Sequence, residues 1–184
     1  MLRVAWTAVW ASGFRSPWRG LYTARGQYVI GDVQDQTNDE VNVITAKGQS
    51  FGWPGASGPC TGTCTGPATY YRGTHDPYDG TGSAVKEARV GRAVWVGAQY
   101  GDWGNDRYNG ALTGVVVFGD YYAGWFRGLV LDDAGKITKD QSLGDQGGVS
   151  AVFQRDDGYL YVLSLGPYGT AAGEKAVLLR ALPQ

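Results

Sequence analysis

Gly26-Gln27-Tyr28-Val29-Ile30-Gly31-Asp32 and Gly114-Val115-Val116-Val117-Phe118-Gly119-Asp120 share the pattern G-x-x-x-[IF]-G-D, and their first glycines are 88 residues apart. A weaker third copy, Gly158-Tyr159-Leu160-Tyr161-Val162-Leu163-Ser164, begins 44 residues after the second. This copy keeps only the leading glycine and the apolar run. Because 88 is twice 44, the chain has the character of an array with a period of about 44 residues.

A period of about this length, made of short apolar runs and glycine turns, is typical of one four-stranded blade of a β-propeller. Helical repeats of similar length need longer apolar stripes, and helices tolerate glycine poorly. The chain contains 30 glycines, which disfavours helices. The sequence therefore predicts an all-β fold, a partial β-propeller of about three four-stranded blades.

The strands expected in these blades are short apolar runs that end at glycine or at an acidic turn. A stretch rich in Gly, Pro, Ser and Thr predicts a loop insertion over about residues 54–82, within a single domain of residues 1–184. The expected strands cover residues 21–23, 28–31 and 41–45 in the first blade, 93–97, 114–118 and 125–131 in the second, and 149–153, 159–165 and 176–182 in the third.

Three blades are too few to close a ring, because propellers usually have about four to eight. An open arc leaves an apolar face and unpaired strand edges uncovered. We therefore expect a half-ring, completed either by a missing N-terminal half or by a second copy in a homodimer. A truncated gene product, marginal because part of its ring is absent, is the remaining interpretation.

Composition restricts the partners of the chain. With 43% apolar residues the chain can bury a core, and its formal net charge of −1 gives no basic surface for nucleic acid. No membrane span is visible. The first residues lack the apolar segment and the small-residue cleavage site of a signal peptide. We therefore expect neither nucleic acid nor a membrane as a partner.

The two cysteines, Cys60 and Cys64, form a C-x-x-x-C pair. Such a pair could bind a metal, but zinc sites need four ligands and the sequence has no second cluster of Cys and His. We favour a disulfide that closes a small loop, which implies an oxidising compartment.

Four acidic residues, Asp32, Asp35, Asp39 and Glu40, lie between two expected strands. Several carboxylates with neighbouring amides suit a hard cation such as calcium, although the spacing is not that of an EF-hand loop. A solvated acidic turn is the competing interpretation, and the residue pattern alone favours it.

His75 is the only histidine, and it is followed by Asp76. A histidine beside an aspartate could act as a general base, but most loop histidines are simply exposed, and no nucleophile signature surrounds this one. Among the many aromatic residues, those near Tyr100 and at Tyr121-Tyr122 are candidates to stack on a sugar or another planar ligand, whereas most others should pack between blades.

Four motifs in the first third of the chain resemble the glucose/sorbosone dehydrogenase family. They are Trp10-Ala11-Ser12-Gly13-Phe14-Arg15-Ser16-Pro17-Trp18-Arg19, Gly31-Asp32-Val33, Asn38-Asp39-Glu40-Val41-Asn42 and Phe51-Gly52-Trp53-Pro54. The family has A-x-G-x-R-N-P, GDV or HG, D/E-E-[IVL]-N and N-[YF]-G-W-P in this order and at about these spacings. Later segments such as Phe118-Gly119-Asp120-Tyr121 are similar to its last blades, so the resemblance covers the C-terminal half of the family's domain.

The resemblance implies a six-bladed propeller, exported to the periplasm or the extracellular space, that uses pyrroloquinoline quinone (PQQ) and calcium to oxidise aldose sugars. It implies that Arg15 contacts the cofactor. It also implies that the acidic turn from Asp32 to Glu40 supplies calcium ligands, partly through backbone carbonyls, with Asp39 and Glu40 matching best.

The chain departs from the family pattern at several cofactor positions. The base histidine of the family lies in the N-terminal half, so His75 does not inherit its role. Ser16 replaces an asparagine, Tyr122 and Ala123 stand where a lysine is expected, and Gly147-Gly148 stand where arginines are expected. Two interpretations follow: a half-ring of a PQQ-dependent sugar dehydrogenase whose competence needs a further chain, or a non-catalytic propeller that binds a protein or a glycan.

Overall fold

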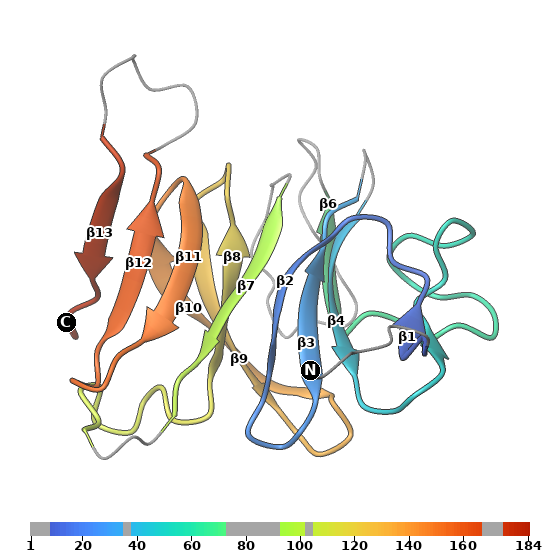
Figure 1. The fold of residues 1–184 in the computed structure, drawn as a ribbon, viewed down its shortest axis with the longest axis horizontal. Helices are drawn as coiled ribbons and strands as arrows, with labels where there is room; N and C mark the ends of the chain where they lie inside the picture. Colours follow the sequence, from blue (N-terminus) through green and yellow to red (C-terminus); the bar gives the residue numbers. More distant parts are fainter. Residues whose placement is uncertain (1–7, 35–37, 73–92, 102–104, 167–174) are drawn as a thin grey trace, which may run out of the picture.

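The structure is a computed structural model that describes residues 8–34, 38–72, 93–101, 105–166 and 175–184. Throughout these residues the regular structure is β, and Figure 1 shows three sheets standing side by side. The first sheet has the strand order β2-β3-β4-β6 and the second β10-β9-β8-β7, while the third, in its described part, has the order β11-β12-β13. All pairings within these sheets are antiparallel. The prediction of a partial propeller with about three blades is therefore confirmed.

The strands are short, as alternating apolar residues and glycine turns dictate. A separate parallel pair, β1 and β5, lies beside the first sheet. The bounds are β1 (Ala11–Ser12), β2 (Pro17–Tyr22), β3 (Tyr28–Asp32), β4 (Asn38–Ile44), β5 (Gln49–Ser50), β6 (Thr69–Arg72), β7 (Val94–Gln99), β8 (Val116–Asp120), β9 (Trp125–Leu131), β10 (Ile137–Asp145), β11 (Val149–Gln154), β12 (Leu160–Ser164) and β13 (Val177–Arg180).

In its described part, residues 54–72, the expected loop insertion over about residues 54–82 contains one strand. Strand β6 lies within this range and pairs with β4, so it completes the first sheet. Tyr71 of β6 is buried and packs edge-on against Trp125, which explains why four residues in a Gly- and Pro-rich context are held as a strand. Residues 51–68 form no strand, and residues 73–82 lie outside the described part of the chain.

The three copies of the sequence repeat occupy equivalent positions in the three sheets. Strands β3, β8 and β12 are the second strands of their sheets, and each begins two residues after the leading glycine of its copy. In the described chain, the first apolar core lies between the first two sheets. Val29 and Val41 meet Val94 and Phe118 there, and all four are fully buried.

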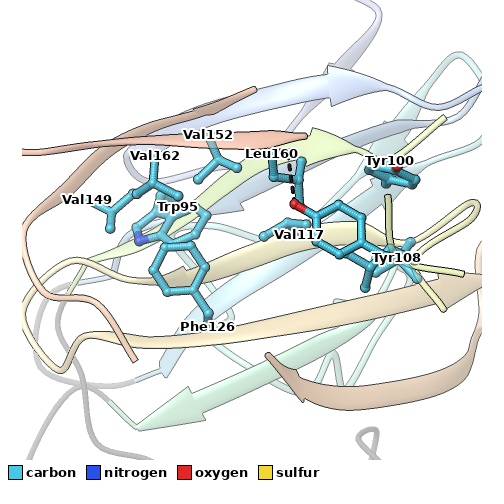
Figure 2. Packing of buried hydrophobic residues seen from close by; sticks show 11 residues of the cluster. Trp95, Tyr100, Tyr108, Val117, Phe126, Val149, Val152, Leu160 and Val162 are labelled. Carbon is cyan, nitrogen blue, oxygen red and sulfur yellow. Dashed lines mark hydrogen bonds between the residues drawn. The ribbon is translucent and has the colours of Figure 1, made fainter. Parts of the chain in front are cut away.

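A second core lies between the second and third sheets. Figure 2 shows Trp95 and Phe126 of the second sheet facing Val149, Val152 and Val162 of the third. The rings of Trp95 and Phe126 meet edge to face with centroids 4.8 Å apart, a favourable arrangement for aromatic pairs. The second sheet thus uses its two faces for two different neighbours, as a blade does.

The first strands of the three sheets, β2, β7 and β11, lie next to one another, with β7 between the other two. In a propeller this position faces the central axis. No helix among the described residues is long and apolar enough to cross a membrane.

Candidate functional site

A buried aspartate ends the second strand of the first sheet and fixes the backbone that precedes β2. Asp32 is fully buried, and its carboxylate accepts hydrogen bonds from the backbone N–H groups of Arg15 (3.0 Å) and Ser16 (2.7 Å). Charge-assisted hydrogen bonds of this kind are strong. The loop that carries Arg15 is therefore attached to β3 through backbone atoms.

The second repeat builds the same arrangement. Asp120 at the end of β8 is fully buried and accepts hydrogen bonds from the N–H groups of Ala93 (3.0 Å), Tyr122 (2.8 Å) and Ala123 (2.7 Å). In the third copy Ser164 takes the position, and its hydroxyl donates to the carbonyl of Gly147 at 2.7 Å. The last residue of each copy thus orders the backbone at one end of β2, β7 and β11, the axial strands.

An open pocket of about 840 Å³, the axial pocket, lies at this end of the axial strands. It collects residues from all three sheets because the ordered loops converge there. Trp18 is 49% exposed and Tyr122 is 45% exposed, so both rings present large faces to the pocket. The described lining contains no acidic side chain, and it consists of Arg15, Ser16, Pro17, Trp18, Arg19, Val33, Ala93, Tyr121, Tyr122, Ser150 and Leu165.

The two arginines of the pocket are held differently. The Arg15 side chain is half-buried, donates to the carbonyl of Val33 at 3.2 Å and lies over the ring of Trp53 with its Cζ 5.8 Å from the centroid. Arg19 is exposed, and its Cζ lies 5.7 Å from the ring centroid of Trp18. Guanidinium groups next to aromatic faces suit planar anionic ligands.

Arg19 also has an unusual backbone. Its φ is 55°, a left-handed value that is costly for a side chain of this kind. The pairing of β2 with β3 shifts register between Trp18 and Gly20, so Arg19 is the extra residue of a β-bulge. Strain and bulges are concentrated at functional sites, where they direct a side chain. Here the bulge lies at the pocket.

In the described part of the acidic turn, the carboxylates of Asp32, Asp39 and Glu40 bind the N–H groups around them. All six carboxylate oxygens of Asp32, Asp39 and Glu40 accept hydrogen bonds. In addition to the donors already named, Gln34 contacts Asp32 and Asp39, Val94 contacts Asp39, and Gly58 and Asn42 contact Glu40.

This arrangement does not fit a calcium ion, which needs six to eight free oxygen ligands. Among the described residues no three acidic, histidine or cysteine side chains converge on a point where a metal could sit. Asp35 lies outside the described residues. Asp32, Asp39 and Glu40 are also buried, so they do not form a solvated turn either.

Burial raises the pKa values of Asp32, Asp39 and Glu40. Desolvation raises the pKa of Asp39 to about 6 and that of Glu40 to about 7, against the opposing effect of their hydrogen bonds. The pKa of Asp32 is also raised by burial, although the N–H groups of Arg15 and Ser16 act in the other direction.

The cysteine pair lies in the loop after β5, apart from the axial pocket. Cys60 and Cys64 form a disulfide with their Cα atoms 5.8 Å apart. The disulfide closes a small exposed loop and leaves no thiol for a metal.

Of the remaining candidates, Tyr121 and Tyr122 line the pocket, whereas Tyr100 is fully buried in the second core and cannot stack on a ligand. His75 lies outside the described residues. The sequence analysis missed Arg19 and Trp18 as pocket residues. A signal was available, because Gly20 within a strand marks a bulge or a close backbone approach.

Comparison with known proteins agrees with this geometry. A family model described as Glucose / Sorbosone dehydrogenase matches residues 3–172. No curated protein matches the chain.

Several solved structures are similar. The PQQ-bound form of aldose sugar dehydrogenase from Streptomyces coelicolor has a TM-score of 0.64 at 16% identity, over 94% of this chain and 44% of that one. A glucose dehydrogenase has a TM-score of 0.65 at 22% identity, over 94% and 46%. The soluble aldose sugar dehydrogenase from Escherichia coli, in its apo-form, gives 0.58 at 17%, over 84% and 43%. The chain therefore spans less than half the length of these structures, and the likeness shows a shared fold.

Proposed function

We propose, from the premise that this chain belongs to the glucose/sorbosone dehydrogenase family, that it forms half of a PQQ-dependent ring that oxidises aldose sugars. The axial pocket carries the proposal. It lies where the loops of three blades converge, and its described lining combines two arginines with exposed aromatic rings and no acidic group. One similar structure is described as a PQQ-bound form, which supports the choice of cofactor.

The residues present fit a planar, polyanionic quinone. Arg15 and Arg19 would pair with its carboxylates, because guanidinium groups bind carboxylates through charge-assisted hydrogen bonds. The exposed face of Trp18 offers a stacking surface, and Tyr121 with Tyr122 would exclude water from one side. When bound, the quinone supplies the acceptor for the two electrons that leave the sugar.

The chain's own part in the reaction is to bind and orient. The pocket's described lining holds no imidazole or carboxylate, so a base for the sugar hydroxyl must come from another part of the ring. Calcium has no fitting site among the described residues, and the proposal assigns it no role. Export to the periplasm or beyond remains part of the proposal, and the Cys60–Cys64 disulfide supports it.

The test is a titration with PQQ, followed by quenching of tryptophan fluorescence. We expect saturable quenching in the wild type and a clear loss of quenching in Trp18→Leu, whose substitution removes a half-exposed ring. A planar quinone without carboxylates serves as the control ligand and should bind more weakly. Absence of saturable quenching by PQQ would reject the cofactor assignment.

Reduction of a dye by aldoses, measured with PQQ present, then separates the two functions. The lack of a base in the described lining is the observation that favours a non-catalytic binding module for a glycan or a protein. Saturable PQQ binding with aldose-dependent dye reduction supports the dehydrogenase. Glycan binding without turnover, in the absence of PQQ binding, supports the module.

A further inference from the structure

Alternate residues of the repeat strand face the preceding sheet and the following sheet. On β8, Val116 and Phe118 belong to the core shared with the preceding sheet, while Val117 belongs to the core shared with the following sheet. Strand β12 repeats the first half of this rule, because Leu160 and Val162 pack against the second sheet. Val29 of β3 repeats the second half by packing against the second sheet from the other side.

Among the described sheets, the first has no sheet against its preceding face and the third has none against its following face. The outer part of the first sheet's preceding face is buried, since Glu40, Asn42 and Ile44 are at most 7% exposed and Gly58 N donates to Glu40 there, so only its inner part is open. Tyr28 and Ile30 point in the direction of a preceding blade, and together with Trp10 and Tyr22 they line an open apolar hollow of about 360 Å³. At the other end Tyr161 and Leu163 point in the direction of a following blade. Leu163 is 37% exposed, and the neighbouring Phe153 and Leu178 are 39% and 58% exposed.

One of these open faces is directed toward a preceding blade and the other toward a following blade. Among the described residues no sheet precedes the first sheet and none follows the third, so the first sheet of one molecule can follow the third sheet of another. Leu163 strengthens this reading, because it stands where the other two copies have Gly31 and Gly119 and thus adds an apolar side chain to the open face.

A hydrogen bond between blades recurs and fixes where such a contact would fall. The Gln99 side chain at the end of β7 accepts from the N–H of Ala24 in the first sheet at 2.7 Å. One blade further on, Gln154 at the end of β11 accepts from the N–H of Gly101 in the second sheet at 2.8 Å. Both contacts join the end of one first strand to the turn that follows the neighbouring one.

Two positions of this series lack such an inter-blade hydrogen bond in the described chain. Tyr22 ends β2, as Gln99 and Gln154 end their strands, and it is 71% exposed. Asp156 stands in the third turn, where Ala24 stands in the first. The two turns have the same backbone bonds, from Thr23 N to Gln27 O and from Arg155 N to Tyr159 O.

We propose that a second copy of this chain covers both open faces, with Tyr22 of each molecule beside Asp156 of the other. Each half-ring then supplies three blades. The chain spans 44–46% of two similar structures, so two copies span about nine-tenths of such a length. The contact is heterologous, but it occurs twice around a two-fold axis and therefore closes. The inference rests on the proposed function, in that a ring supplies the second wall which the axial pocket lacks.

The first test is the mass of the 184-residue chain in solution by light scattering, without cofactor. We expect twice 19.7 kDa. Leu163→Asp places a charge in the covered face and should halve the mass, while circular dichroism verifies that the sheets remain. Leu182→Asp is the matched control, since Leu182 is 62% exposed but lies outside both faces, and this variant should stay dimeric. A monomeric wild type overturns the proposal.

The second test uses single-cysteine variants and a short bismaleimide, which spares the native disulfide. A mixture of Tyr22→Cys and Asp156→Cys molecules should give a covalent dimer. Either variant alone, or Asp156→Cys mixed with the exposed control Lys47→Cys, should give none. Linkage of one variant to itself, or association only with a separate N-terminal-half polypeptide, overturns the proposal. A dimer that fails to bind PQQ rejects the proposed function alone, and a monomer that binds PQQ rejects the pairing alone.

Discussion

The Tyr71 hydroxyl of the first sheet donates a 2.6 Å hydrogen bond to Oδ2 of Asp120 in the second sheet. A longer contact of 3.4 Å joins the same hydroxyl to Oδ2 of Asp39. All three side chains are buried, and Val94 N and Ala93 N donate to the same two carboxylate oxygens. One phenol therefore links two blades through two carboxylates.

Tyr71→Phe is expected to lower the free energy of unfolding by roughly 1.5–3 kcal/mol, the usual value of a hydrogen bond to a charged group. Urea unfolding followed by fluorescence measures the change. Thr61→Val is the control, because it also removes one hydroxyl but at an exposed loop position, and it should change the free energy by less than about 0.5 kcal/mol. Equal effects of the two variants would contradict a linking role for Tyr71.

The stability of the protein is expected to fall as the pH rises from about 4.5 to about 7. The folded state raises the pKa of Glu40 from 4.5 to about 7, so the neutral acid is favoured by folding. This contribution is complete below the unfolded pKa and is lost as the pH rises through the folded one. Asp39, raised from 3.8 to about 6, acts in the same direction.

Glu40→Gln should flatten this dependence, because the amide stays neutral. The Gln carbonyl can still accept from Gly58 N, and its amino group can donate to Asn42 Oδ1, which is buried without a partner. Melting temperatures measured between pH 4 and pH 8 compare the two proteins. A variant that keeps the full slope would show that Glu40 is not the titrating group.

Calcium added at pH 7 is expected to leave the melting temperature unchanged. All six oxygens of Asp32, Asp39 and Glu40 already accept hydrogen bonds, so the ion would have to displace buried donors. Magnesium serves as the control ion. A rise specific to calcium would support the ligands expected from the family resemblance, since a ligand that binds only the folded state raises its stability.

Arg19→Gly should separate function from stability. Glycine accepts the φ of 55° without strain, which offsets its greater freedom in the unfolded chain, so the melting temperature should hardly change. Loss of the guanidinium should weaken PQQ binding by roughly 10- to 100-fold, the equivalent of one charge-assisted contact. Arg25→Gly, at an exposed turn away from the pocket, should bind PQQ as the wild type does.

Asp140→Ala is expected to destabilise the second sheet strongly. Asp140 and Arg127 form an ion pair of 2.7 Å in which their side chains are only 0% and 6% exposed. Removing one partner of such a pair leaves a buried charge and costs roughly 3–5 kcal/mol. The exposed pair of Arg25 and Asp133 gives the contrast, since Asp133→Ala should cost less than about 1 kcal/mol in the same denaturation experiment.

The strands that sequence could predict are those with an apolar face on both sides. Strands β3, β8 and β12 are identified by their repeat, because each carries apolar residues on both faces, and in β8 these alternate between two buried cores. Strand β10 was not expected. Its sequence, Ile137 to Asp145, is mostly polar, since it is the outer strand of its sheet and only Ile137 and Leu143 pack against the two cores.

The site was predictable to a smaller extent. The resemblance directed attention to Arg15, and the structure places it in the axial pocket. The role of the acidic turn could not be obtained from residue types, because a carboxylate serves equally well for a cation or for backbone N–H groups. Only the fold decides, by bringing Arg15, Ser16 and Val94 to within hydrogen-bonding distance of Asp32 and Asp39.

The carboxylates at the strand ends hold main-chain atoms, and this has a consequence for how the pocket can change over evolution. Asp32 and Asp120 hold the amide groups of Arg15, Ser16 and Tyr122, and these hydrogen bonds do not depend on which side chains the three residues carry. Substitution at these positions alters which ligand the axial pocket binds, while the backbone around the pocket stays in place. A lineage can therefore exchange one ligand for another here without first inventing a new loop.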